Sequence, residues 1–437
     1  MRATVEKLIY GGEGIAHESA ETIFVPFVLG GEQAEIQIVE RTKKFARGRI
    51  TRLLSASPER VQPHCPHFGI CGGCDYQHAG YAKQLRIKEA ILRDTLQRLG
   101  RIAWSGPIVV HGSPPWEYRN RAQWKIRPVE KQGAGSGRAG STIGYFRARS
   151  STLCSVHTCS IISPKLLGTL AVLREALASG DLPPSLSEIE AFASDDDNAL
   201  LLNITCALPA RLREQLLEKA ATLIPAAKSI LVQDSSTGQM SLRGPGFIHY
   251  NALQRAFRVA HLSFFQVNRF LLEELAATAA RLAGAGELAF DLYAGVGLLS
   301  VLLADNFSRV VAVESNPVAA RDLELNAAQA VTPAENVSVH NQTAQFFFER
   351  RKRDRNVKHP DAIVLDPPRA GLERAVAELV ADAHPRRIVY VSCDPATLAR
   401  DLAKLKPLEY TLQEIHLFDM FPQTYHIESV VLLERAA

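Results

Sequence analysis

The first 55 residues alternate apolar and polar positions in short runs that glycines interrupt. The clearest runs are residues 22–28, 33–40 and 45–52, with Gly30 and Gly31 between the first two. A period of two is typical of strands with one buried face, and glycines mark the turns between such strands. The pattern predicts a small antiparallel β-barrel at the N-terminus.

From about residue 262 the pattern changes, and apolar strand-like runs alternate with helical stretches. The runs are residues 288–293, 309–314, 362–366, 387–392 and 429–433. This alternation is typical of βαβ units, so we expect a parallel α/β sheet with helices on both of its faces. The last run could also be an added antiparallel strand.

The stretch between these two parts is mixed. Residues 81–99 have the apolar spacing of a helix, and residues 119–128 and 142–147 suggest a hairpin joined by a glycine-rich loop at 131–141. No run of 18 apolar residues and no apolar leader is present. We therefore expect no membrane segment and a cytoplasmic protein. Seven cysteines are too few for a disulfide scaffold.

The two parts of the chain differ in net charge. Residues 1–150 carry a net charge of +10 and the rest −6. The last two expected barrel strands hold a group of cations: Arg41, Lys43, Lys44, Arg47, Arg49 and Arg52. Such a face suits RNA phosphates, although a solvated edge strand guarded by charge is the alternative.

The turn after the first C-terminal strand has the residues of a nucleotide site. Asp291-Leu-Tyr-Ala-Gly-Val-Gly297 joins that strand to a helix, and Glu314 ends the next strand. Glycines let a ligand approach the backbone, and an acid at this strand end can bind both ribose hydroxyls. NAD and S-adenosylmethionine both fit. Ser300 replaces the third glycine of the dinucleotide fingerprint, which disfavours NAD.

Two reactive residues adjoin later strands. Cys393 follows the run 387–392, and Glu428 precedes the run 429–433. Pyrimidine C5 is too weakly nucleophilic to attack a methyl sulfonium unless a thiolate first adds to C6, and a base must then remove the C5 proton. Cys393 and Glu428 are candidates for these roles, with Arg369 as a candidate activator of the thiol. The alternatives are an inert thiol and a strand-edge acid.

Cys65, Cys71 and Cys74 are spaced as C-x5-C-x2-C. Three thiols are one ligand short of a closed site, so Cys159 or Cys154 must supply the fourth. Thiolates suit either a [4Fe-4S] cluster or zinc, and composition does not separate the two. Histidines nearby keep a mixed zinc site open: His64, His67 and His78.

Together these motifs resemble the RNA (uracil-5-)-methyltransferases, in particular the bacterial 23S rRNA enzymes with an iron–sulfur cluster. The resemblance extends over nearly the whole chain. It implies an OB-like TRAM β-barrel over residues 1–56, which binds RNA. It further implies a mixed central domain with the cluster segment over 57–255, and a class I Rossmann-like S-adenosylmethionine-dependent methyltransferase domain over 256–437.

The resemblance also implies roles for single residues. Ser392-Cys-Asp-Pro matches the family's nucleophile motif at Cys393, and Phe421-Pro-x-Thr-x-His-x-Glu matches its base motif at Glu428. Cys159 is preferred to Cys154 as the fourth cluster ligand. Four residues fall on contacts with S-adenosylmethionine: Gln266, Tyr293, Glu314 and Asp366. The expected cluster is structural, because methyl transfer moves no electrons.

The expected partner is RNA, with 23S rRNA favoured and tRNA as an alternative, and we expect a monomer. Two rival functions are a methyltransferase acting on amino groups, suggested by Asp366-Pro-Pro, and a non-catalytic RNA-binding iron–sulfur protein.

Leu298 stands where some family members have a polar residue, and it is left out of the site. Residues 346–355 are read as a charged loop rather than an RNA contact. In the segment 116–124, Arg119 and Arg121 could hold phosphates, and its tryptophans either stack on bases or pack in the core.

Overall fold

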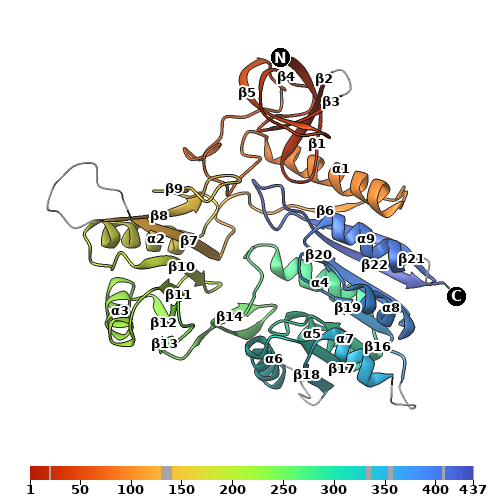
Figure 1. Cartoon of the computed structure of the whole chain (residues 1–437). Coiled ribbons are helices and arrows are strands. Elements are labelled where there is room, and N and C mark those ends of the chain that lie inside the picture. The colour runs from red at the N-terminus through yellow and green to blue at the C-terminus, as the bar shows by residue number, and fades with distance from the viewer. Residues whose placement is uncertain (19–20, 129–139, 331–335, 353–357, 406–408, 437) are drawn as a thin grey trace.

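A computed structural model describes residues 1–18, 21–128, 140–330, 336–352, 358–405 and 409–436. Figure 1 shows three units, with a small barrel at the top, a mixed sheet on one side below it and a larger sheet on the other. No helix in these ranges has the length and apolar character that a membrane crossing needs.

The N-terminal unit is a closed five-stranded barrel, as the sequence predicts. Its strands are β1 (Arg2–Leu8), β2 (Glu13–Glu18), β3 (Glu21–Pro26), β4 (Gln33–Arg41) and β5 (Ala46–Ser55). Pairing of β1 with β4 closes the barrel around Val5, Ile23 and Ile36. The expectation of a purely antiparallel barrel is wrong in one place, because β3 and β5 run parallel.

The central unit is a seven-stranded sheet with the order β13-β12-β11-β10-β7-β8-β9. Its elements are β7 (Arg121–Pro128), β8 (Ser141–Phe146), β9 (Leu153–Ser155), α2 (Pro164–Ala178), β10 (Leu186–Ala193), β11 (Leu200–Cys206), α3 (Ala210–Leu223), β12 (Ala227–Asp234) and β13 (Met240–Arg243). The predicted hairpin is confirmed, since β7 and β8 pair antiparallel. Residues 131–139 of its predicted loop lie outside the described residues.

The C-terminal unit is an eight-stranded sheet with the order β18-β17-β16-β19-β20-β22-β21-β6. A separate two-stranded sheet of β14 (Phe247–Ala252) and β15 (Arg255–Ala260) precedes it. The helices and strands that follow are α4 (Leu272–Ala283), β16 (Gly286–Leu292), α5 (Leu298–Leu303), β17 (Phe307–Glu314), α6 (Pro317–Ala330), β18 (Val337–Asn341), α7 (Ala344–Arg351), β19 (Ala362–Leu365), α8 (Arg374–Asp382), β20 (Arg387–Ser392), α9 (Pro395–Leu405), β21 (Tyr410–Phe418) and β22 (Glu428–Arg435). The α/β prediction is confirmed. The final strand is antiparallel to β20, which resolves the alternative left open by the sequence.

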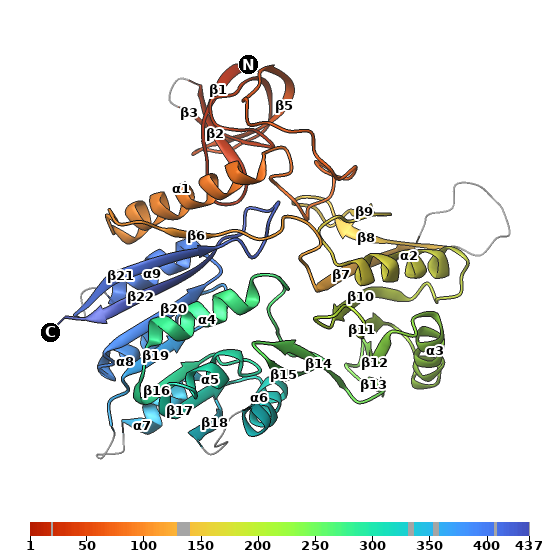
Figure 2. The same cartoon turned by 180° about the vertical axis from the view of Figure 1, so that it is seen from behind.

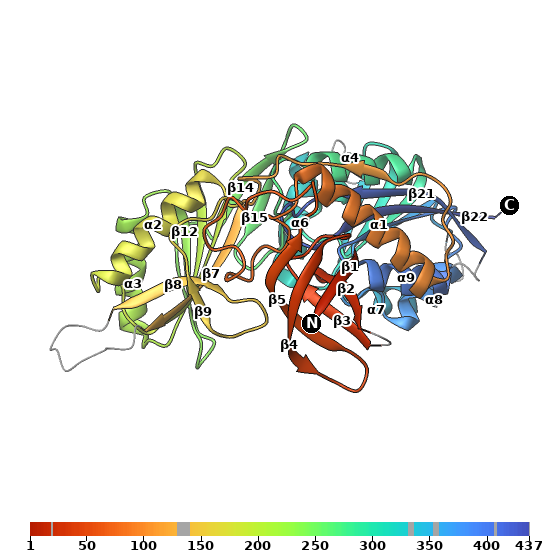
Figure 3. The ribbon, with the colours of Figure 1, turned by 90° about the horizontal axis from the view of Figure 1, so that it is seen from above.

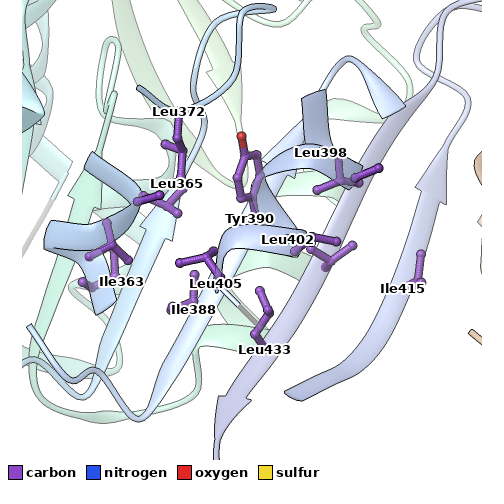
Figure 4. Packing of buried hydrophobic residues seen from close by; sticks show 14 of the residues in the cluster. Ile363, Leu365, Leu372, Ile388, Tyr390, Leu398, Leu402, Leu405, Ile415 and Leu433 are labelled. Carbon is purple, nitrogen blue, oxygen red and sulfur yellow. The ribbon is translucent and has the colours of Figure 1, made fainter. Parts of the chain in front are cut away.

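The inner strands are apolar at successive positions over most of their length because both faces of the sheet are covered. In β20, Ile388 and Tyr390 pack with α8 and α9, whereas Val389 and Val391 face α4 on the opposite side. Figure 4 shows the first of these cores, with Leu398 and the neighbouring leucines of α9 lying over β20. Burial on both faces explains why these strands read as continuous apolar runs.

Two N-terminal elements join the C-terminal unit. The predicted helix is α1 (Tyr81–Gly100), and the strand β6 (Val109–His111) pairs with β21 at the edge of the large sheet. Figures 2 and 3 show α1 between the barrel and this sheet. Ile91 and Leu92 of α1 share an apolar core with α9. The stretch 57–255 therefore contributes to two units, and its outer bounds stay a prediction.

Residues 346–355 were expected to form a charged loop, and this is wrong for the described part. Residues through Arg351 belong to α7, because Phe347 and Phe348 are buried against Phe290 of β16. Residues 353–355 lie outside the described ranges. Periodic apolar positions, more than the charges between them, decide the local structure here.

Candidate active site

A cavity of about 820 Å³ opens at the carboxyl ends of the parallel strands of the large sheet. It brings together six residues singled out in the sequence: Gln266, Tyr293, Glu314, Asp366, Cys393 and Glu428. They come from separate strand ends and from the loop before α4. Convergence of these residues in one crevice is what strand-end placement in an open α/β sheet predicts.

The pairing of β20 with β22 brings Cys393 and Glu428 side by side. Ser392 pairs with Ser429, so the next residue on each strand is Cys393 or Glu428. Because β22 runs antiparallel, its first residue lies at the same edge as the last residues of the parallel strands. Asp366 follows β19, the other neighbour of β20, and completes the group.

Burial and like charges keep protons on this group. Burial first, and then Glu428 and Asp366, raise the pKa of the Cys393 thiol to about 12. Burial raises the pKa of Glu428 well above its usual range, with Asp366 adding to the effect. Arg369 lowers both pKa values but does not cancel the burial. The expected activator is therefore near the thiol, but it leaves that thiol protonated in the free protein.

Asp291 is a site residue that the sequence analysis passed over as part of a motif. It is fully buried at the end of β16 and lines the cavity. Ser300, which replaces the third fingerprint glycine, donates a hydrogen bond of 2.5 Å to Asp291 Oδ2. Burial raises the Asp291 pKa to about 7, and Oδ1 has no hydrogen-bond partner among the described residues. An acid inside an apolar strand was the available signal.

The side of the cavity formed by Gly295 and Glu314 is held by backbone contacts. Glu314 accepts hydrogen bonds from Gly295 N at 2.8 Å and Asn316 N at 2.6 Å, which fix its carboxylate at the end of β17. Each carboxylate oxygen keeps a lone pair for a ribose hydroxyl. Gly297 has φ +93°, and a Cβ there would come within 2.3 Å of Leu323 Cδ1, so glycine is required at the start of α5.

Tyr293 and Leu298 also border this side of the cavity. Tyr293 has φ +65°, a left-handed conformation that is strained for a tyrosine and is typical of functional sites. Leu298, which the sequence analysis left out, contributes apolar wall rather than a hydrogen bond. Phe264 lines the cavity as well and is 60% exposed, so the mouth carries an aromatic ring.

Side chains of α1 hold the loop between β21 and β22, which leads to Glu428. Lys88 Nζ lies 2.5 Å from Asp419 Oδ1, with both side chains fully buried, and it also donates to Phe421 O at 3.0 Å. Gln84 of α1 donates to Gln423 Oε1 at 3.0 Å and accepts from Gln423 N at 2.9 Å. The sequence contains no local signal for these contacts.

Asn268 also holds the end of this loop that follows β21. Its Nδ2 donates to Met420 O at 3.2 Å, and its Oδ1 accepts from Phe270 N at 2.9 Å just before α4. Asn268 is fully buried and therefore links the Gln266 segment to the Glu428 loop. This residue positions the site without lining the cavity.

A second cavity of about 200 Å³ lies between the segment after the barrel and the central sheet. It is lined by the four cysteines of the predicted cluster: Cys65, Cys71, Cys74 and Cys159. Cys154 is buried on β9 and does not line it. Among the described side chains, no three His, Cys, Asp or Glu residues are placed to hold a single metal ion.

The surroundings of the cysteine cavity are cationic. Arg119 and Arg121 line it, and Arg119 Nε is buried without a hydrogen-bond partner among the described residues. Arg121 donates to Ser263 O at 3.1 Å and lies over the Phe192 ring, so it is not free for phosphates. Trp124 is fully buried, which supports core packing for that tryptophan.

Comparisons with known proteins agree with this arrangement. The model of the tRNA (Uracil-5-)-methyltransferase family matches residues 238–436, and that of the TRAM domain matches residues 1–51. The 23S rRNA (uracil(1939)-C(5))-methyltransferase RlmD of Klebsiella pneumoniae is 33% identical, over 99% of this chain and 95% of its own length. An uncharacterized RNA methyltransferase of Aquifex aeolicus is 31% identical, over 99% of this chain and 98% of its own length.

One solved structure matches the whole fold. It is the Pyrococcus abyssi tRNA (uracil-54, C5)-methyltransferase in complex with S-adenosyl-L-homocysteine, with a TM-score of 0.74. The match covers 99% of each chain at 24% sequence identity. The likeness therefore extends over the barrel, the central sheet and the large sheet alike.

Proposed function

The chain belongs to the RNA (uracil-5-)-methyltransferase family, whose enzymes use S-adenosylmethionine, and from this premise we propose a covalent mechanism. In it, the sulfur of Cys393 bonds to C6 of the target uracil and Glu428 acts as the base. One observation carries the proposal. The adjacent strands β19, β20 and β22 bring Asp366, Cys393 and Glu428 to one wall of the large cavity.

The roles of the two residues follow from the electron balance. When the Cys393 thiolate adds to C6, the S–C6 bond forms and the C5–C6 π electrons move toward C4–O, which makes C5 nucleophilic. Bound S-adenosylmethionine supplies the methyl group from a sulfonium. Before these steps the Cys393 thiol and the Glu428 carboxyl must each give up their proton to water, because burial keeps both protonated in the free protein. The Glu428 carboxylate then takes the C5 proton, the C5–C6 double bond re-forms, and the S–C6 bond breaks to release the thiolate.

The same wall explains why the thiol stays protonated until substrates are bound. In the free protein burial first, and then the acids beside Cys393, disfavour a negative charge on the thiol. A cationic cofactor at Asp366 removes part of that penalty, because opposite charge favours the ionised form of a neighbouring acid. We propose that Gln266, Tyr293, Glu314 and Asp366 hold this cofactor. Their place along one cavity supports the assignment.

The Cys393→Ala variant tests the covalent mechanism. We expect RNA methylation to fall by at least ~10³-fold and the covalent adduct with 5-fluorouridine RNA to disappear, because no other group supplies the attacking sulfur. Binding of S-adenosylmethionine should persist. Cys206→Ala is the matched control, because that buried thiol lies on β11, outside the cavity. Wild-type turnover in Cys393→Ala would overturn the proposal.

For the substrate, we propose a uridine of 23S rRNA. The support is the 33% identity to an enzyme named for 23S rRNA, against 24% for the solved enzyme named for tRNA. A tRNA uridine is the second candidate, because the latter match covers the whole chain. Mapping of 5-methyluridine in RNA from cells lacking the protein separates the two. We further propose a monomeric enzyme that acts in the cytoplasm.

We also propose that Cys65, Cys71, Cys74 and Cys159 hold a [4Fe-4S] cluster, with zinc as the alternative. Four thiols around one cavity are a donor set suited to iron–sulfur binding. The cavity of about 200 Å³ exceeds the ~30 Å³ share of a single water several times, so it offers more room than one ion needs. Arg119, whose charge lowers the pKa of Cys159 against the effect of burial, would balance part of the negative charge of four thiolates, whereas Arg121 already pairs with Glu190.

A further inference from the structure

The turn between the first two barrel strands packs against the rest of the protein rather than facing solvent. It spans residues 9–12, after Leu8, which belongs to the apolar core shared by α1 and the large sheet. Tyr10 packs on this core. At the other end of the turn, the buried Glu13 pairs with Arg149 of the central unit at 2.6 Å. One turn therefore contacts both other units.

Tyr10 contacts the segments that carry the proposed nucleophile and base. Its ring lies edge-on to Tyr425, with centroids 5.4 Å apart, and Tyr425 is three residues before Glu428. Burial first, and then the nearby side chain of Asp394, which follows Cys393, raise the pKa of Tyr10. The Asp394 carboxylate also accepts two backbone N–H groups at the start of α9, at 2.9 Å each.

Gly12 connects the same turn, through Asp75, to the loop that leads to Glu428. It has φ +85°, and a Cβ there would lie only 3.0 Å from Asp75 Cβ. Asp75 N donates to Gln423 O at 2.9 Å, and its Oδ2 accepts from Tyr425 N at 3.3 Å. Since Asp75 directly follows Cys74, the turn also adjoins the cysteine segment.

We propose that Tyr10 is a positioning residue for methyl transfer, which holds the Cys393 turn and the Glu428 loop at a fixed spacing. The inference rests on the proposed roles of Cys393 and Glu428. Small displacements of reacting groups cost large factors in rate, so a contact that fixes two catalytic segments acts on turnover. The barrel then contributes to the chemical step as well as to RNA binding.

Two substitutions test this role through the division between kcat and KM. Tyr10→Phe removes the hydroxyl beside Asp394 but keeps the ring on Tyr425, and we expect kcat to fall by about 5–10-fold. Tyr10→Ala removes both contacts, and we expect a fall of about 100-fold. KM for RNA should stay within about twofold in both, because the RNA contacts are unchanged.

Phe45→Ala is the matched control, because it deletes a similar edge-to-face pair, Phe24 with Phe45 at 5.3 Å, within the barrel. It should keep the wild-type kcat. A change confined to KM in Tyr10→Ala, or an unchanged kcat in both Tyr10 variants, would overturn the positioning role.

The rate of adduct formation with 5-fluorouridine RNA tests the positioning role of Tyr10 separately from the covalent mechanism of Cys393. We expect a slower single-turnover rate in both Tyr10 variants, with S-adenosylmethionine affinity unchanged. If the wild-type protein forms no adduct, the covalent mechanism fails. If Tyr10→Ala forms it at the wild-type rate, only the positioning role fails.

Discussion

Five of the seven cysteines line the two cavities, and their neighbours differ in kind. Cys393 lies beside two carboxyl groups, Glu428 and Asp366, at the end of a strand buried in a regular sheet. The other four thiols lie in irregular segments. The described residues around them include Arg119 and Arg121 but no carboxylate.

The difference shows that the charged groups around a thiol determine the role to which it is suited. Acids beside Cys393 hold it neutral and supply a proton acceptor, which suits a bond that forms and breaks in each cycle. Arg119 beside the four thiols would offset part of the charge of thiolates, which suits their proposed role as cluster ligands. Burial first, and then the neighbouring thiols, raise the pKa of Cys71 to about 12, so without a metal this group is also protonated.

Among substitutions that test the contrast between Cys393 and the other four cysteines, we expect Glu428→Gln to have the largest effect, a loss of turnover. Without the base, Cys393 still adds to C6 but the C5 proton stays, so a protein–RNA adduct should accumulate with ordinary RNA substrate. Turnover should fall by about 10²–10⁴-fold. Mass analysis of denatured protein measures the adduct. Glu414→Gln, on β21 and paired with Arg281, is the control and should turn over normally. Normal turnover in Glu428→Gln would end the assignment of the base.

The next-largest effect concerns the four cysteines of the second cavity, which we propose as ligands of the cluster. Anaerobically purified wild-type protein should contain about four irons and four sulfides per chain, and Cys74→Ser should lose them. Loss of the site should destabilise the fold by about 3 kcal/mol and, for a chain of 437 residues, lower Tm by roughly 3 °C. Cys206→Ser, outside both cavities, should keep its iron. Stoichiometric zinc in the wild-type protein would contradict the cluster.

The smallest effect is a pH dependence. Burial first, and then Asp291, raise the Asp366 pKa to about 7. Below pH 7 a cation at this carboxyl must displace a proton, whereas above pH 7 the carboxylate is already ionised. Affinity for S-adenosylmethionine should therefore rise with pH, by about tenfold from pH 6 to 8 relative to S-adenosylhomocysteine, which lacks the sulfonium charge. Calorimetry of both ligands measures the ratio. A flat ratio, or one that survives Asp366→Asn, would refute the role of Asp366.

The sequence predicted the parts of the site that lie next to strands. Apolar runs marked where β19 and β20 end, so the residue order placed Asp366 and Cys393 at one sheet edge. Glu428 joins them only because β22 is antiparallel, which the sequence left open. The barrel was predictable for the same reason, since its period of two reports a single buried face.

What the sequence missed depends on distant contacts. Lys88 is an ordinary helix cation in the sequence, and only its partner Asp419 explains its burial. The β6 strand is three residues long, too short to carry a pattern. Tyr10 occupies a turn whose neighbours come from the far end of the chain. The α7 error arose from giving charge more weight than the buried Phe347 and Phe348.

The buried pair of Lys88 and Asp419 has a consequence for how the protein is made. The two residues are 331 positions apart, so the ribosome completes the helix that carries the lysine long before it delivers the aspartate. At ~5–20 residues per second, that interval is roughly 15–65 s. Until it ends, the apolar side of the helix has no sheet to cover it. The nascent chain must remain shielded from aggregation over that time, and final assembly waits for the last strands to emerge.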